Sequence, residues 1–109
     1  GVEGAKEIAD LMTKFRNDAP SEFAGYEVAA LEDFAKSEKR LADGTVTKID
    51  LPTSNVLKYI LADGTWIAVR PSGTEPKIKF YIGTQADSLA KAEEKRAAFE
   101  DAITAFVKG

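Results

Sequence analysis

The 109-residue sequence contains no cysteine and no histidine. Without cysteine, the chain can form neither a disulfide framework nor a thiolate metal site. Without histidine, it lacks the commonest general base and the commonest zinc ligand of proteins. Any chemistry in this chain therefore depends on other kinds of side chain.

Long apolar runs and an excess of positive charge are also missing. No run approaches the length of a membrane span and no signal peptide is visible, so we expect a cytoplasmic protein without a membrane partner. The formal net charge is −3, whereas a nucleic-acid-binding domain usually carries a basic face, so no nucleic-acid partner is expected. With 44% hydrophobic and 30% charged residues, the composition is typical of one globular domain, short for a complete metabolic enzyme.

Apolar periodicity predicts a helix near each end of the chain. The first spans residues 3–17, and its apolar stripe consists of Ile8, Leu11, Met12 and Phe15. The second begins after Asp87 or Ser88 as the N-cap and runs to about Val107. The apolar stripe of this second helix consists of Leu89, Ala92, Phe99, Ile103 and Phe106.

Four strands are predicted between the helices, over residues 26–34, 54–61, 66–70 and 78–82. The first is alanine-rich and compatible with a helix as well. Asp63-Gly64 marks a hairpin turn between the second and third strands. The polar residues 35–48, with a turn at Asp43-Gly44, are expected to form a solvated loop.

Alternation assigns the strand residues to faces. On one face of the first strand lie Tyr26, Val28 and Ala30. In the third strand, Ile67 and Val69 share one face, and Trp66, Ala68 and Arg70 share the other. In the fourth, the apolar face carries Ile78, Phe80 and Ile82, whereas the opposite face carries Lys77, Lys79 and Tyr81.

The order helix, four strands, helix predicts an α+β fold. We expect a four-stranded, mainly antiparallel sheet with both helices packed on one face. Residues 1–109 contain no internal repeat and form a single domain.

The stretch RPSGTEPK, residues 70–77, lies between the third and fourth strands. Arg70 offers a planar fork of donors that matches two phosphate oxygens. Ser72 and Thr74 each offer a hydroxyl donor. This inventory favours binding of a phosphate.

Backbone features of the same stretch favour that function too. Gly73 can take a positive φ and has no Cβ, so main-chain N–H groups can close on an anion. Pro71 and Pro76 fix the shape of the turn before a ligand arrives. Lys77 and Lys79 add local positive charge, which fits a small anionic ligand.

The string RPSGTEPK followed by IKFY closely resembles the phosphate-binding loop in the C-terminal domain of the α-D-phosphohexomutases, the phosphoglucomutase/phosphomannomutase family. Residues 51–58 (LPTSNVLK) and 63–66 (DGTW) also resemble this family, especially its bacterial phosphoglucomutase branch. The resemblance implies an architecture grouped with TATA-binding-protein-like folds. That grouping concerns shape and implies no DNA binding.

The resemblance also implies a role. The family moves a phosphoryl group between the 1- and 6-positions of a hexose phosphate, using a phosphoserine, Mg²⁺ and a hexose 1,6-bisphosphate intermediate supplied by other domains. Its C-terminal domain binds the phosphate that is not being transferred. Carried onto this sequence, that phosphate would be held by Arg70, Ser72, Gly73 and Thr74, with Lys79 or Lys77 adding charge.

The family's other motifs are missing from the chain. It has no Thr-Ala-Ser-His-Asn-Pro nucleophile segment, no Asp-x-Asp-x-Asp metal loop and no Gly-Glu-x-Ser-Gly sugar motif. We therefore expect no catalytic and no metal-binding residue here. The chain is expected to be the C-terminal phosphosugar-binding domain excised from a larger mutase, inactive alone, with hexose phosphate and the other domains as its partners.

Two other functions compete with this one. The chain could be a stand-alone phosphate- or metabolite-binding module without catalysis, or a structural domain in which the loop is only a rigid turn. Glu75 is expected to neutralise part of the local charge by pairing with Arg70, Lys77 or Lys79, rather than to act as a catalytic acid.

Overall fold

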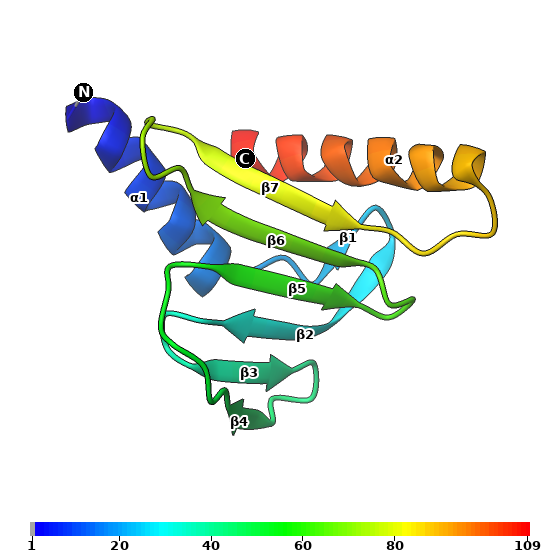
Figure 1. Ribbon diagram of the computed structural model, residues 1–109, viewed down its shortest axis with the longest axis horizontal. Coiled ribbons are helices and arrows are strands. Elements are labelled where there is room, and N and C mark those ends of the chain that lie inside the picture. The colour runs from blue at the N-terminus through cyan, green and yellow to red at the C-terminus, as the bar shows by residue number, and fades with distance from the viewer. Residues whose placement is uncertain (1) are drawn as a thin grey trace.

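The computed structural model of the chain describes residues 2–109. Helix α1 (Val2–Asn17) comes first and helix α2 (Leu89–Lys108) comes last (Figure 1). The strands between them are β1 (Glu22–Phe23), β2 (Tyr26–Asp33), β3 (Glu38–Leu41), β4 (Val46–Lys48), β5 (Leu57–Leu61), β6 (Trp66–Pro71) and β7 (Ile78–Gly83). The α+β class and both predicted helices are confirmed.

The strands form one sheet in the order β4-β3-β2-β5-β6-β7, and the short β1 pairs with β2. Every pairing among the described residues is antiparallel. The antiparallel character is therefore confirmed, whereas the predicted number of four strands is wrong. The four predicted strands correspond to β2, β5, β6 and β7, although β5 begins at Leu57 and not at residue 54.

The missed strands β3 and β4 occupy half of the expected solvated loop. Glu38 of β3 pairs with Lys48 of β4, and the predicted turn between them is present, with Gly44 at φ 92°. This hairpin lies at the edge of the sheet and is largely exposed; Val46 keeps 50% of its surface. Because such a strand buries no continuous apolar face, its sequence lacks the alternation that identifies a buried strand.

Both helices pack on one face of the sheet, as expected. The core between them contains Met12, Phe15, Phe23, Leu31, Leu57, Tyr59, Leu61, Ile67, Val69, Phe99 and Ile103. The rings of Phe15 in α1 and Phe106 in α2 lie 4.8 Å apart, which joins the two helices over the same face. Figure 1 shows α1 crossing one end of the strands, beside the β6–β7 loop, while α2 runs along the β7 edge.

The predicted faces of β6 and β7 are confirmed. Ile67 and Val69 are fully buried, and the apolar residues of β7 pack against the same core. We call the opposite side of the sheet, away from the helices, the outer face. In this region it carries Lys58, Trp66, Ala68, Arg70, Lys79 and Tyr81.

The face assignment in β2 is wrong for one residue. Tyr26 and Val28 pack against the core, but the register shifts between Val28 and Ala30, so Ala30 lies opposite Ile60 on the other face. Such an extra residue in one strand is a β-bulge, which reverses the parity of everything after it. Leu31 takes the core position that alternation had assigned to Ala30.

Helix α2 begins as predicted at its cap, where the Ser88 hydroxyl oxygen accepts a hydrogen bond from the Lys91 main-chain N–H at 3.2 Å. Phe99 and Ile103 are buried, but Leu89 is 79% exposed. Its assignment to the apolar stripe was therefore wrong. Figure 1 shows why, since the first turns of α2 extend past the end of the sheet.

Helix α1 contacts strand β2 near its end and the β6–β7 loop near its start. Near its end, the Arg16 guanidinium donates to Asp33 of β2 at 2.8 Å. Near its start, Gly4 lies against the loop, because a Cβ added there would come within 2.9 Å of the Pro76 Cβ. The start of α1 therefore packs directly against the loop.

Candidate functional site

The candidate site is the loop between β6 and β7. The two strands stay in register up to the pair Pro71–Ile78, so the loop contains only residues 72–77. Its base is closed by a hydrogen bond from the Ser72 main-chain N–H to the Lys77 carbonyl oxygen at 2.8 Å. A second bond of 2.8 Å runs from the Lys77 N–H to the Glu75 carbonyl oxygen. The loop is therefore an ordered turn.

The Ser72 hydroxyl organises the tip of the loop. Its oxygen accepts hydrogen bonds from the main-chain N–H groups of Thr74, at 3.3 Å, and Glu75, at 3.2 Å. Among the described residues, the N–H of Gly73 is then the one N–H of the loop without a partner. The Ser72 hydroxyl can still donate its own hydrogen, because it only accepts in these contacts.

Gly73 does not use the conformational freedom that the sequence offered. Its φ lies outside the left-handed region, and a Cβ added to it would meet no atom within 4 Å. The position is exposed, and the space that a side chain would occupy there is open. An anion could therefore approach the backbone closely at Gly73.

A cavity of about 340 Å³ lies beside the loop, on the side of α1. It is lined by Ala5, Ile8, Ser72, Gly73, Thr74, Glu75 and Pro76. The predicted residues Ser72, Gly73 and Thr74 thus share one wall. No Lys or Arg lines this cavity.

Arg70 lies on the outer face instead. Its Nη2 donates to the hydroxyl oxygen of Tyr81 at 3.2 Å, and its Cζ lies 5.6 Å from the centre of the Tyr81 ring. Lys79 is the residue directly opposite Arg70 in the β6–β7 register. In the described part of the chain, neither Arg70 nor Lys79 forms an ion pair with a carboxylate.

Lys77 differs from these two cations. Its Nζ lies 3.1 Å from the Glu75 Oε2, and the two side chains keep 55% and 60% of their surface. The expectation that Glu75 forms an ion pair is confirmed, with Lys77 as its partner. Because both groups are exposed, the pair adds little stability, but it offsets the charge of Lys77 locally.

The structure therefore divides the predicted residues into two groups. Ser72, Gly73 and Thr74 line the cavity beside α1, whereas Arg70 and Lys79 lie on the adjoining strands, on the outer face. Sequence analysis did not identify Tyr81 as part of this arrangement. The signal was its position in β7, two residues after Lys79 and on the same face.

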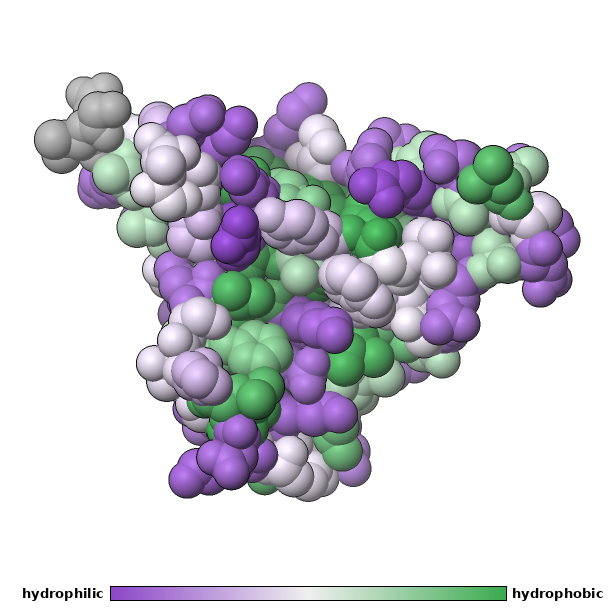
Figure 2. Space-filling model, viewed as in Figure 1, coloured by the Kyte–Doolittle hydropathy of each residue, from purple (hydrophilic) through white to green (hydrophobic). Residues whose placement is uncertain are grey.

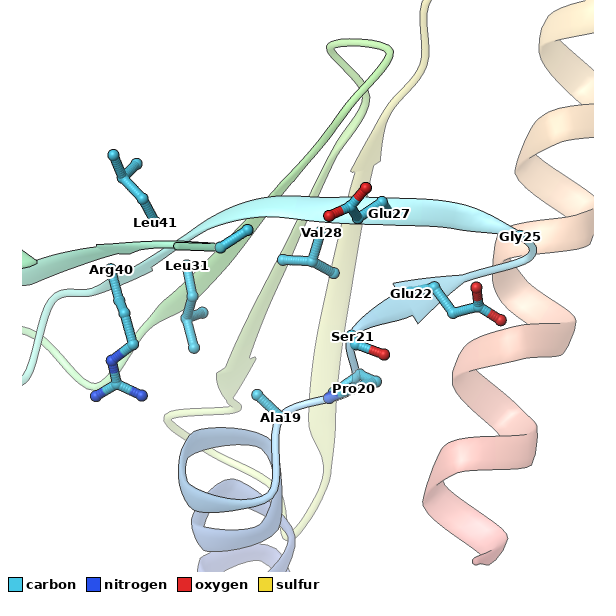
Figure 3. Close-up of a pocket in the computed structure, with 11 residues that line it drawn as sticks. Ala19, Pro20, Ser21, Glu22, Gly25, Glu27, Val28, Leu31, Arg40 and Leu41 are labelled. Atoms are coloured by element: carbon cyan, nitrogen blue, oxygen red, sulfur yellow. The ribbon is translucent and has the colours of Figure 1, made fainter. Parts of the chain in front are cut away.

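A larger cavity, of about 640 Å³, lies elsewhere. It opens below β2 and β3, next to the segment that follows α1 (Figure 3). Its one cation, Arg40, is accompanied by Glu22 and Glu27, and Figure 3 shows Arg40 across Leu31 from both carboxylates. This lining is less suited to an anion than the loop.

Other kinds of site find little support in residues 2–109. No three potential metal ligands of the types His, Cys, Asp and Glu come together there, and no helix is long and apolar enough to cross a membrane. Figure 2 shows polar and apolar residues interspersed over the side of the molecule in view, without one broad apolar patch.

Comparison with known proteins gives the loop a context. Residues 12–102 match the family described as "Phosphoglucomutase/phosphomannomutase, C-terminal domain". The chain is 43% identical over 96 residues to a phosphoglucomutase of Staphylococcus aureus strain MRSA252. It is 44% identical over the same length to one of Staphylococcus epidermidis strain ATCC 12228. Each alignment covers 87% of this chain but only 17% of the relative, so the chain spans about one sixth of their length. No solved structure matches, so the grouping with TATA-binding-protein-like folds stays a prediction.

Proposed function

The chain belongs to the phosphoglucomutase/phosphomannomutase family as its C-terminal domain, and we propose that its β6–β7 loop binds the non-transferred phosphate of a hexose phosphate during 1,6-phosphoryl transfer. The relatives that carry this domain are named phosphoglucomutases. The reaction would therefore be an isomerisation carried out by the whole enzyme, with this domain holding one end of the substrate.

One observation carries the proposal more than any other. Arg70 is exposed, has no acidic partner among the described residues, and lies two residues before a loop with a free N–H at Gly73. A guanidinium without a carboxylate partner keeps its full charge and most of its donors for a ligand. A phosphate between the outer face and the loop tip would accept hydrogen bonds from Arg70 on one side and from the Ser72 hydroxyl on the other.

Lys79 is the better candidate for the additional cation. It faces Arg70 across the β6–β7 pair, so the two positive charges lie side by side on the outer face. Lys77 is engaged by Glu75 at 3.1 Å, and that carboxylate would repel a phosphate. We therefore assign the additional charge to Lys79, with Lys77 serving mainly to neutralise Glu75.

Such a phosphate site fits the chemistry of the reaction. Binding energy from a phosphate that does not react can position the end that does. A hexose bisphosphate intermediate must also turn around, so that either phosphate can occupy this site. A loop that reads charge and donors accepts both orientations, whereas a pocket shaped to one sugar face would not.

The remaining parts of the reaction would come from other domains of the enzyme. No group of three potential metal ligands is found in residues 2–109, and the resemblance assigns the metal loop to another domain. The magnesium ion, the phosphoserine and the hexose 1,6-bisphosphate would accordingly be held elsewhere. We propose that this chain alone is an inactive domain of a longer cytoplasmic mutase.

The test is Arg70→Ala in the full-length protein, compared with Arg96→Ala as a control. Arg96 is also exposed but lies on α2, paired with Glu100 at 3.4 Å. Loss of charge-assisted hydrogen bonds to phosphate should cost about 1.5–3 kcal/mol, which corresponds to an affinity for glucose 1-phosphate about 10- to 150-fold weaker. The control should leave the affinity unchanged.

The competing functions predict other results. A stand-alone binding module would show the same affinity loss in a protein without mutase activity. A purely structural loop would show a lower melting temperature for Arg70→Ala with unchanged affinity for glucose 1-phosphate, and that result would refute the proposal.

A further inference from the structure

Arg70 and Tyr81 lie diagonally across the β6–β7 pair on the outer face. In the register, Ala68 is opposite Tyr81 and Arg70 is opposite Lys79. Because side chains alternate along each strand, all four point to the same side. Diagonal neighbours on a sheet are within reach of aromatic and long side chains. The methyl group of Ala68 leaves room between the two longer chains.

Two contacts hold the guanidinium on the tyrosine. The Arg70 Nη2 donates to the Tyr81 hydroxyl at 3.2 Å, and the Arg70 Cζ lies 5.6 Å from the centre of the ring. The hydroxyl acceptor engages one of the five guanidinium N–H donors, and the ring face attracts the cation. The remaining donors stay available to a ligand.

The chemical nature of this partner matters. A carboxylate would order the arginine, but it would also cancel its charge and repel an incoming phosphate. In the neighbouring loop, Lys77 has such a carboxylate partner, Glu75. A neutral tyrosine restricts the many rotamers of an arginine without either effect, so less order has to be gained when the ligand binds.

We propose that Tyr81 is a positioning residue for Arg70, ordering its guanidinium on the outer face before a phosphate arrives. This inference rests on the proposed function, because it assumes that Arg70 binds phosphate. Tyr81 itself need not touch the ligand. Its 42% exposed side chain lies outside the core, so substitutions there should leave the fold intact.

The experiment measures the dissociation constants of glucose 1-phosphate and inorganic phosphate for the full-length protein, by isothermal titration calorimetry with metal chelated. Tyr81→Phe keeps the ring but loses the acceptor, and should weaken both ligands about threefold. Tyr81→Leu loses both contacts and should weaken them about fivefold to tenfold. Tyr26→Phe is the matched control, since that ring packs against Phe99 on the other face and the affinities should not change.

The same substitutions are then made in an Arg70→Ala background. If Tyr81 acts through Arg70, Tyr81→Leu should change the affinities there by less than about twofold, because contacting residues are not additive. Equal losses in both backgrounds, or no loss in either, would overturn the positioning role. Melting temperatures are recorded for all variants, and an affinity loss explained by a lower melting temperature would also overturn it.

The two proposals fail in different ways. If Arg70→Ala leaves phosphate affinity unchanged, the proposed function fails and the inference fails with it. If Arg70→Ala weakens binding but the Tyr81 variants behave like Tyr26→Phe, only the inference is overturned.

Discussion

The largely buried ion pair between Arg16 and Asp33 offers the sharpest test of what holds this fold together. The perturbation is Asp33→Asn, which removes a charge with almost no change in shape. The Arg16 Nε lies 2.8 Å from the Asp33 Oδ2, and the two side chains keep only 17% and 10% of their surface. The pair joins the end of α1 to the end of β2.

The geometry indicates a large effect. Besides Arg16, the Asp33 carboxylate accepts hydrogen bonds from the main-chain N–H groups of Ala35, at 3.0 Å, and Lys36, at 3.2 Å, through its second oxygen. An asparagine keeps one acceptor oxygen, so it must give up either the guanidinium or the turn. Breaking a fully buried pair costs about 3–5 kcal/mol. With the residual exposure, we expect a loss of about 2–3 kcal/mol, a large share of the stability of a small domain.

The assay is urea unfolding of the 109-residue chain, followed by tryptophan fluorescence. At an m-value of about 1.5 kcal/mol per molar, the midpoint should fall by about 1.5 M. Asp10→Asn is the matched control, because Asp10 forms a pair of similar length with Lys6 at 2.9 Å but both side chains are 65% or more exposed. Exposed pairs contribute little, so this midpoint should not move. Equal midpoints for the two variants would refute the reasoning.

Two further predictions concern the sheet. Burial alone would raise the pKa of Asp63, but hydrogen bonds, chiefly from Lys95 at 2.8 Å, outweigh it and hold that pKa below its ordinary value. A lowered pKa in the folded state stabilises the fold above the unfolded pKa, about 3.9, and the gain is lost as the pH falls. Asp63→Asn should therefore lower the melting temperature at pH 7, with the difference from the parent shrinking below about pH 4; a constant difference would contradict this. Gly83→Ala should cost about 1–3 kcal/mol in urea unfolding, because the new Cβ would overlap the Trp66 ring. Gly73→Ala has open space and should stay within about 0.5 kcal/mol; similar losses for both would argue against this packing.

The parts of the fold that could be predicted from sequence are those with a single buried face. Helix α1 was recognised because residues spaced by three and four, such as Met12 and Phe15, pack against the core. Strands β6 and β7 were recognised because alternate residues such as Ile67 and Phe80 do so. In each case burial imposes a period on the sequence, and the period identifies the element.

The errors have the opposite cause. The hairpin of β3 and β4 buries neither face continuously, so hydrogen bonding to β2 holds it in the sheet without imposing a pattern. The bulge near Ala29 reverses which side chains of β2 face the core, and no residue type there indicates a bulge. Leu89 has the spacing of a core residue but lies where α2 has passed the end of the sheet. Each of these depends on the position of distant strands.

The same division applies to the candidate site. The loop itself was predicted, since a run of donors between two apolar strands is a local feature of the sequence. The partner of Arg70 was not predicted, because Arg70 and Tyr81 are eleven residues apart and meet only through the antiparallel register. The outcome has a chemical consequence: Glu75 pairs with Lys77 within the loop, whereas the register places a tyrosine hydroxyl beside Arg70. If the site binds phosphate, replacing Tyr81 by glutamate should weaken glucose 1-phosphate binding more than Tyr81→Leu does, because a carboxylate would order the guanidinium and cancel its charge at once.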